Sequence, residues 1–341
     1  MTDNILKIWV RADAGPEIGY GHVKRTLTVL SELATRKKIS VNYIMTADSD
    51  TLPIIDAGWN LVSTGQKFGT NWAKHINGNG GLLILDSYNI FEEDLVNLRS
   101  LSIPVIMFDD GCRLKTYMAD MVIDSAPQAD KLDYRGLKNT CFCLGLAFYP
   151  LREEFRNVLP RTEQPGLARH IAITFGGSDP DDSTGKYLEA VGSIDNIELI
   201  DVILGPGYRG VAEETYNDKR INFIRHTDKM AKFLRNSDLA LSASGGTAIE
   251  LSYLGVPGVL IALSPDQEPI AKNLSQAGVA RYLGRLEDVS IDDVKIELEY
   301  LIKDKNMRQS MSKNGRNIVD GSGAERIVDN ILKIVDGWRE D

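Results

Sequence analysis

Short apolar runs alternate with longer segments of helical periodicity along most of this chain. Several runs are continuous rather than alternating, which is typical of strands buried on both faces of a parallel sheet. Strands separated by helical segments of about ten to fifteen residues indicate βαβ units. The pattern predicts strands over residues 5–13, 41–48, 82–88, 104–110, 121–126, 141–148, 170–177, 199–207, 221–227, 238–244 and 257–263.

Residues 159–170 separate the chain into two halves. This segment contains two prolines, a glycine and several polar residues, a composition typical of a linker. We predict an α/β protein with two Rossmann-like, doubly wound parallel-sheet domains, residues 1–160 and 165–341. Ligand binding is expected at the carboxyl ends of the strands, in a cleft between the domains. The helical segments after about residue 287 are assigned to the second domain.

The composition narrows the class of protein. The chain has 341 residues, of which 43% are hydrophobic and 26% charged, as in ordinary globular proteins. Its net charge of −9 argues against a nucleic-acid-binding surface. No run approaches the roughly 18 apolar residues of a membrane span, and the first residues lack the pattern of a signal peptide. We expect a cytoplasmic protein without membrane insertion, and a monomer, since no oligomerisation pattern is visible.

A glycine-rich turn with a histidine follows the first predicted strand. The sequence Gly19-Tyr20-Gly21-His22 leads into a segment of helical periodicity. Glycines allow a tight turn, and the N–H groups and dipole of a helix start favour a phosphate nearby. The same dipole disfavours imidazolium, so we expect His22 to be neutral, the form that a general base requires. The alternative is that His22 only caps the helix or packs locally.

Two further glycine-rich turns follow strands of the second half. Gly176-Gly177-Ser178 ends one predicted strand, and Ser244-Gly245-Gly246 ends another. Both turns lead into helical segments, so both are candidate phosphate sites. For the first turn, an ordinary strand–helix connection capped by Asp or Ser is an equal alternative.

Polar side chains follow at the same expected sheet edge. Thr247 and Glu250 have the T-x-x-E spacing of a capping box, which gives Glu250 a structural alternative. The functional interpretation is that the Glu250 carboxylate accepts hydrogen bonds from a ribose diol. Asp266 and Gln267 open another helical segment and are candidates for contacts with sugar hydroxyls, with solvation of the helix start as the alternative.

Acidic residues also end two strands of the first half. Asp86, Ser87 and Tyr88 follow one strand, and Asp109 and Asp110 follow the next. An acidic pair can bind a metal ion through its oxygens, but nothing else in the sequence completes such a site. We therefore predict neither a metal nor a cofactor.

The order of these segments resembles a known enzyme family. The resemblance is carried by RAD, IGYGHVKR, LLILDSY, MFDDG, GLAFYPLREEF, FGGSDP, SASGGTAIEL and DQE, and it extends to about residue 285. This ordered set is similar to that of the UDP-2,4-diacetamido-2,4,6-trideoxy-β-L-altropyranose hydrolases of pseudaminic acid biosynthesis, and to the related spore-coat polysaccharide proteins of the SpsG type. The resemblance implies a GT-B-like fold, as in the glycosyltransferase that makes lipid II, which shares the SxSGGTxxEL segment.

The resemblance implies a hydrolase that releases UDP from a UDP-sugar by cleaving the glycosidic C–O bond with inversion at the anomeric carbon. It implies that His22 activates water, that Tyr88 lies near the reacting centre and that Glu250 contacts the uridine ribose. UDP leaves readily when N–H donors neutralise its charge, so one neutral base suffices and a paired carboxylic acid is not required. The expected substrate-binding residues are Arg11, Asp13, Gly21, Arg25, Tyr88, Gly176, Gly177, Ser178, Ser244, Gly245, Gly246, Glu250, Asp266 and Gln267.

The sequence leaves the sugar and the reaction class open. Ser87 stands where the flagellar enzymes have His, and Asp266 stands where they commonly have Asn. A different diacetamido-trideoxyhexose or another UDP-sugar therefore fits equally. The first alternative function is a GT-B glycosyltransferase with a polysaccharide or lipid acceptor, and the second is a non-catalytic nucleotide-sugar-binding protein.

Overall fold

A computed structural model of the chain describes residues 5–15, 18–64, 69–76, 81–177, 179–225, 227 and 229–338. Contacts divide the chain into two compact units. The first comprises the residues up to Arg152 and those from Gly321 onward, and the second is Glu153–Asp320. Within the described ranges no helix has the length and apolarity that crossing a bilayer requires.

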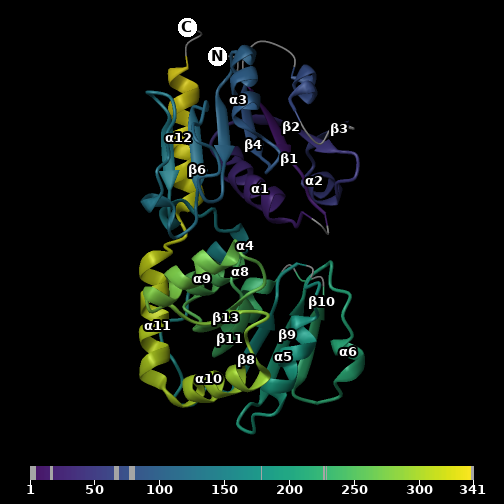
Figure 1. The fold of residues 1–341 in the computed structure, drawn as a ribbon, viewed down its shortest axis with the longest axis vertical. Helices are drawn as coiled ribbons and strands as arrows, with labels where there is room; N and C mark the ends of the chain where they lie inside the picture. The colour runs from purple at the N-terminus through teal and green to yellow at the C-terminus, as the bar shows by residue number, and fades with distance from the viewer. Residues whose placement is uncertain are drawn as a thin grey trace. The chain divides into compact units, whose positions relative to one another are not determined.

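The first unit is built on a parallel sheet whose seven described strands have the order β3-β2-β1-β4-β5-β6-β7 (Figure 1). Its strands are β1 (Leu6–Ala12), β2 (Ile39–Thr46), β3 (Asn60–Thr64), β4 (Leu82–Asp86), β5 (Val105–Phe108), β6 (Met121–Asp124) and β7 (Cys141–Leu144). Its helices are α1 (Gly21–Ala34), α2 (Leu52–Asp56), α3 (Glu92–Leu98) and α12 (Gly323–Gly337).

The second unit repeats this design with six described strands in the order β10-β9-β8-β11-β12-β13. Its strands are β8 (His170–Thr174), β9 (Leu199–Leu204), β10 (Ile221–Arg225), β11 (Leu239–Ala243), β12 (Gly258–Ala262) and β13 (Ala280–Arg285). Its helices are α4 (Glu153–Arg156), α5 (Ser183–Gly192), α6 (Ala212–Thr215), α7 (Met230–Asn236), α8 (Gly246–Leu254), α9 (Gln267–Gln276), α10 (Ile291–Lys303) and α11 (Lys305–Ile318).

The strand order places a topological switch point in each sheet. In the first unit the chain runs outward from β1 through β2 to β3 and then crosses to β4 on the other side of β1. In the second unit β8, β9, β10 and β11 follow the same course. Ligands of such sheets bind outside the carboxyl ends of the two strands at the switch point. The prediction of two Rossmann-like parallel sheets is confirmed. The switch points make the loops after β1 and β4, and after β8 and β11, the expected places for ligand binding.

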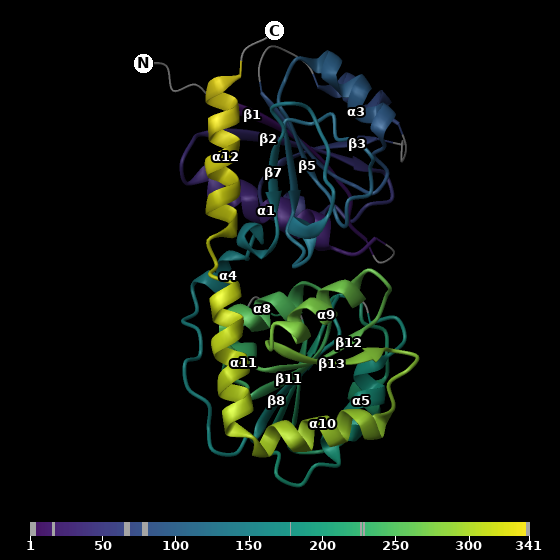
Figure 2. The same cartoon turned by 60° about the vertical axis from the view of Figure 1, so that its left-hand side comes forward.

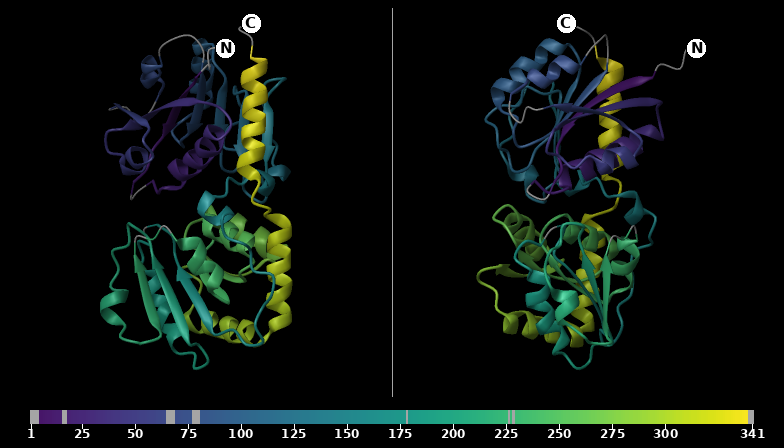
Figure 3. Two further views of the ribbon diagram at one scale, coloured as in Figure 1. Left: turned by 180° about the vertical axis from the view of Figure 1, so that it is seen from behind. Right: turned by 90° about the vertical axis from the view of Figure 1, so that its right-hand side faces the viewer.

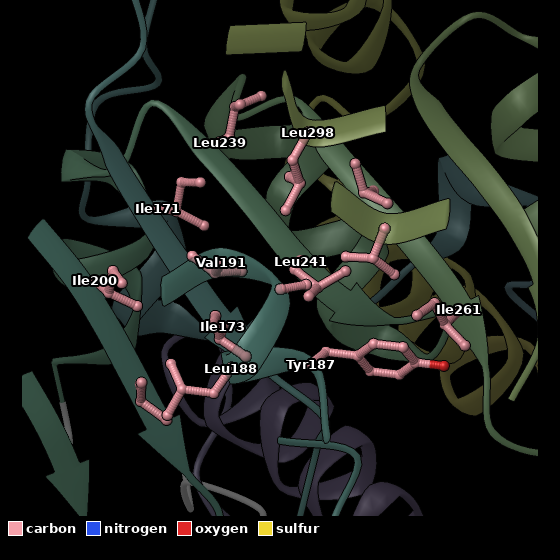
Figure 4. Close-up of a cluster of buried hydrophobic side chains, with 14 of the residues drawn as sticks. Ile171, Ile173, Tyr187, Leu188, Val191, Ile200, Leu239, Leu241, Ile261 and Leu298 are labelled. Carbon is pink, nitrogen blue, oxygen red and sulfur yellow. The ribbon is translucent and has the colours of Figure 1, made fainter. Parts of the chain in front are cut away.

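Both faces of each sheet are covered, which explains the continuous apolar runs. In β1, Ile8 and Val10 pack in one core cluster with α1 and α12, whereas Trp9 belongs to the cluster on the opposite face. The second unit has its own core around β8, β11 and α5, where Ile173, Leu241 and their neighbours interdigitate (Figure 4). Burial of each such side chain contributes about 1.5–3 kcal/mol to the stability of its own unit.

The last helix belongs to the first unit. Figure 2 shows α12, in yellow, alongside α1 and the first sheet, and its apolar stripe of Ile327, Val328 and Ile331 is buried in that core. The preceding helix α11 packs instead on α8 of the second unit (Figure 3). There a Cβ atom at Gly315 would lie 2.7 Å from the Ser252 carbonyl oxygen, so only glycine allows this approach. The sequence pattern assigns α12 to the second half, because periodicity reveals an apolar stripe but not the surface against which it packs.

Two strands are absent from the sequence prediction. These are β3 and β13, and each lies at an edge of its sheet. Edge strands bury little of their surface, and both carry several half-buried or exposed residues. Their apolar signal is correspondingly weak.

The proline-containing segment 159–170 is packed against the second unit. Arg161 Nη2 donates to Asp238 Oδ1 at 2.7 Å, and the Arg161 amide donates to the Leu254 carbonyl at 2.7 Å. The fully buried Arg308 donates to the Pro165 carbonyl. By contacts, the boundary between the units falls before this segment, between Arg152 and Glu153.

Candidate functional site

His22 lies at the start of α1, directly after the switch-point strand β1. Gly15 and Gly19 form a two-residue bridge that closes the turn, and Gly19 has φ +83°, a conformation that glycine adopts without strain. The helix begins at Gly21, with no acidic residue in its first turn and no capping side chain on Tyr20. The positive end of the α1 dipole is therefore not offset by an acidic residue of that turn. His22 is 6% exposed.

Asp86, at the end of β4, is the partner of His22. The distance between His22 Nδ1 and Asp86 Oδ1 is 2.6 Å, and Asp86 is 1% exposed. When Nδ1 carries the proton and donates it to this carboxylate, the other ring nitrogen, Nε2, holds the lone pair. The ring of Tyr88, two residues after β4, meets the His22 ring edge-on with centroids 4.8 Å apart. Tyr88 is 48% exposed, so this side of the pair is open.

Arg25, one turn along α1, joins Asp86 to Asp110. Its Nε donates to Asp86 Oδ2 and its Nη2 to Asp86 Oδ1, both at 2.6 Å. Its Nη1 and Nη2 donate to the two oxygens of Asp110 at 2.7 and 2.9 Å. Burial alone would raise the pKa of Asp86, but Arg25 and then His22 hold that pKa well below its usual range. Burial likewise opposes ionisation of Asp110, and Arg25 again lowers the pKa of its carboxyl.

The two neighbouring acids Asp109 and Asp110 contact different partners. Asp110 Oδ2 accepts a hydrogen bond from Tyr88 at 3.0 Å as well as those from Arg25. Asp109 Oδ1 accepts from Arg113 Nε at 2.8 Å, and the Arg113 guanidinium lies over the Tyr88 ring at 5.1 Å. Among the described residues no group of three or more His, Cys, Asp or Glu side chains could hold a metal ion. The two acids thus hold Arg25 and Arg113, and Arg113 covers the Tyr88 ring.

Arg11 and Asp13 form an internal ion pair. The distance between Arg11 Nη1 and Asp13 Oδ2 is 2.6 Å, and the two residues are 1% and 3% exposed. Asp13 Oδ1 accepts hydrogen bonds from the Thr46 amide at 2.8 Å and from Ser49 Oγ at 2.9 Å. The pair therefore fixes the end of β2 and the loop after it, and both side chains are almost fully buried.

In the second unit the predicted turns follow β8, β11 and β12, which are adjacent strands. Gly176, with φ +89°, and Gly177 follow β8, while Ser178 lies outside the described residues. Gly177 accepts a hydrogen bond from the Gly207 amide at 2.8 Å. A Cβ atom at Gly205 would collide with the carbonyl oxygens of Gly176 and Gly177, so the turns after β8 and β9 approach at backbone distance.

The start of α5 is already occupied by carboxylates. Asp179 accepts hydrogen bonds from the amides of Ser183 and Thr184 at 2.9 and 2.8 Å. Asp182, the N-cap residue, accepts from the Gly185 amide at 3.1 Å. Because these side chains take the amides that an incoming phosphate would use, only the glycine backbone of this turn remains for a ligand.

The start of α8 has a different character. Its N-cap is Gly245 and its first helical residue is Gly246, so Thr247 lies inside the first turn and not at the N-cap position that the T-x-x-E capping box requires. Gly246 is exposed, whereas Glu250 is 5% exposed. The hydroxyl of Ser244 is fully buried and has no hydrogen-bond partner among the residues that the structure describes. The surface of this turn that faces solvent is therefore mainly backbone.

Gln267 lies between the turn after β12 and the turn after β11. Its Oε1 accepts a hydrogen bond from the Leu263 amide at 3.1 Å. A Cβ atom at Gly245 would lie 3.8 Å from the Gln267 amide nitrogen. Asp266, the N-cap of α9, is exposed beside it. The predicted residues of the second unit thus gather at one sheet edge.

The fold is that of a large group of solved structures. Over 96% of this chain and 99% of the other, the structure is similar to MurG of Acinetobacter baumannii, with a TM-score of 0.70 at 16% sequence identity. The chain has the GT-B fold. Residues 193–330 match the model of the glycosyltransferase family 28 C-terminal domain. This stretch runs from the end of α5 to α12 and includes the turns after β11 and β12.

Two curated relatives are distant but span nearly the whole chain. An uncharacterized protein of Methanocaldococcus jannaschii, MJ1062, is 26% identical and is covered over 73% of its length by 98% of this chain. The spore coat polysaccharide biosynthesis protein SpsG of Bacillus subtilis is 22% identical over 95% of this chain and 97% of its own. The similarity to an SpsG-type protein that the sequence motifs indicated is confirmed.

Proposed function

We propose that this chain is a UDP-sugar hydrolase in which His22 Nε2 accepts a proton from the attacking water. The observation that carries the proposal is the 2.6 Å contact between His22 Nδ1 and a buried, ionised Asp86. This contact orients the ring and leaves Nε2 as the proton acceptor. The similarity to SpsG along nearly the whole chain supports a substrate used in polysaccharide synthesis.

The proposed reaction is a single displacement. Water attacks the anomeric carbon, the bond from that carbon to the phosphate oxygen breaks, and UDP leaves with the electron pair. The proton of the water passes to His22 Nε2, and the sugar is released with inverted configuration. No acid is needed for the leaving group when backbone N–H groups offset the charge that develops on the diphosphate.

We assign UDP to the second unit. Gly246, the first residue of α8, and Gly177, in the turn after β8, are both exposed glycines. They support diphosphate binding because glycine allows close approach of the backbone, and because the positive end of the α8 dipole favours an anion. Glu250, in the first turns of α8, is assigned to the ribose, and Gln267 with Asp266 to the remaining hydroxyls. The position of Glu250, on the turn of α8 that follows its glycine-rich start, supports this ligand role.

The test is a panel of UDP-sugars, including UDP-diacetamido-trideoxyhexoses, incubated without any acceptor. Wild type should release UDP, and His22→Gln should lose about 10²–10⁴-fold in kcat while it keeps its affinity for UDP. His75→Gln is the matched control, since His75 ends a short 3₁₀ turn elsewhere in the first unit and should retain turnover. Normal turnover by His22→Gln would end the proposal.

A second candidate function is favoured by one observation, the match to the glycosyltransferase family 28 C-terminal domain. In a transferase the same histidine would deprotonate an acceptor hydroxyl instead of water. UDP release that depends on an added polysaccharide or lipid acceptor would identify this activity. Binding of UDP with no turnover under either condition would instead identify a nucleotide-sugar-binding protein.

A further inference from the structure

The contacts of Arg25 limit what this residue can do for a ligand. Four hydrogen bonds run from its guanidinium to Asp86 and Asp110. Since a guanidinium has five N–H groups, at most one is left for a substrate phosphate. The side chain is also 18% exposed, and its guanidinium lies 5.1 Å from the centre of the Phe108 ring. Arg25 is thus built into the protein around His22.

Asp86 Oδ1 contacts two nitrogens, one from the His22 ring and one from the positively charged Arg25 guanidinium. It lies 2.6 Å from His22 Nδ1 and 2.6 Å from Arg25 Nη2, and these two nitrogens are 3.4 Å apart. The Asp86 charge favours imidazolium, whereas the adjacent guanidinium charge disfavours it. A histidine paired with a carboxylate alone would hold its proton more tightly and would be less available as a base.

We propose that Arg25 and Asp110 together set the protonation of His22. Arg25 places a positive charge against the Asp86 carboxylate that contacts His22, and Asp110 fixes the guanidinium while moderating that positive charge. This inference rests on the proposed role of His22 as the base. Arg25 and Asp110 are positioning residues in this scheme, since neither contacts the reacting atoms.

The other charged and titratable groups around α1 have partners of their own or face away from His22, so Asp86, Arg25 and Asp110 are the charges that act on its ring. Tyr88 donates a hydrogen bond to Asp110, and burial raises the pKa of Tyr43, from β2, so the Tyr43 phenol stays neutral. By strand alternation Arg11 of β1 shares the face of Trp9, opposite α1. From α12, Asp329 and Asp336 pair with Arg36 and Lys37, which follow the last residue of α1, Ala34.

The test is a pH titration of ¹⁵N-histidine-labelled full-length protein by NMR. The chain has four histidines, and the His22 signal is identified by its loss in His22→Gln. In Arg25→Gln the titration midpoint of His22 should rise by about one pH unit or more relative to wild type, because an opposing positive charge has been removed. In Asp110→Asn, which leaves the Arg25–Asp86 contact intact, the midpoint should fall by a smaller amount.

Two further variants separate charge from structure. Arg25→Lys keeps the positive charge and should restore a midpoint near that of wild type. Arg36→Gln removes the same charge near the far end of α1 and should leave the His22 midpoint unchanged. Midpoints that move in the same direction in Arg25→Gln and Asp110→Asn, or that do not move, would overturn the inference.

The readout does not require turnover, so the two proposals can fail separately. If the midpoints shift as stated but no UDP-sugar is hydrolysed, the role of Arg25 and Asp110 is supported and the hydrolase assignment is wrong. If UDP-sugars are hydrolysed while the midpoints stay fixed, the hydrolase assignment is supported and the role of Arg25 and Asp110 is wrong. Where both hold, the acid limb of kcat/KM should move with the NMR midpoint in each variant.

Discussion

Replacing Asp86 with asparagine should destabilise the first unit in a pH-dependent way. Three donors converge on this carboxylate, since His22 Nδ1 and Arg25 Nη2 share Oδ1 and Arg25 Nε meets Oδ2. An asparagine replaces one acceptor oxygen with an NH₂ group, so in either orientation a donor faces a donor. Breaking a buried charge pair on one side costs about 3 kcal/mol of unfolding free energy.

The pH dependence follows from the lowered pKa of Asp86. A carboxyl whose pKa is lower in the folded state contributes stability that is fully present above its unfolded pKa, about 3.9, and that is lost as the pH falls further. The deficit of Asp86→Asn should therefore be largest at pH 7 and should shrink by about 1.3 kcal/mol at pH 3, as linkage gives for that unfolded pKa.

Tryptophan fluorescence during urea unfolding isolates the relevant transition. All four tryptophans of the chain lie in the first unit, at Trp9, Trp59, Trp72 and Trp338. Asp329→Asn is the matched control, because Asp329, on α12 of the same unit, pairs with Arg36 but has a side chain that is 55% exposed. This substitution should cost less than about 1 kcal/mol of unfolding free energy. A deficit of Asp86→Asn within about 0.5 kcal/mol of zero at pH 7, or one that does not shrink at pH 3, would refute the reasoning.

Three further predictions concern the second unit. Ser244→Ala removes a buried hydroxyl that has no partner among the described residues, so it should raise the unfolding free energy by about 1 kcal/mol. Circular dichroism during unfolding measures this change. Tenfold weaker UDP binding would show instead that the hydroxyl reaches the ligand. Gly205→Ala forces apart the turns after β8 and β9, so UDP affinity measured by calorimetry should fall while the tryptophan transition stays in place. Glu250→Gln should weaken UDP binding about tenfold. Thr247→Ala should change neither affinity nor stability by a comparable amount. Equal effects of the two substitutions would support the capping interpretation instead.

The sequence predicts the strand–helix alternation well, because a strand buried on both faces and an amphipathic helix have distinct local patterns. His22 was placed at a helix start on the same local grounds. Its partners are not local, since Asp86 is 64 positions away and Asp110 lies 85 positions from Arg25. Strand order decides that these carboxylates meet α1, and order is a property of the whole sheet.

The glycine-rich turn after β8 shows a different limit. Its sequence suits a phosphate, yet Asp179 and Asp182 take the first amides of α5. Acidic residues directly before a helix compete with any anion for the same donors, and this competition is readable in the sequence once the helix start is known. Arg11 and Asp13 match a ligand-binding pattern, but only the structure shows that the two side chains are buried and pair with each other.

The most direct test of the account is hydrolysis of a UDP-sugar by wild type in H₂¹⁸O, with mass spectrometry of both products and NMR of the anomer first formed. Water activated by His22 and directed at the anomeric carbon predicts ¹⁸O in the released sugar, none in UDP, and inverted configuration. Label in UDP, or retained configuration, would contradict the proposed attack at carbon.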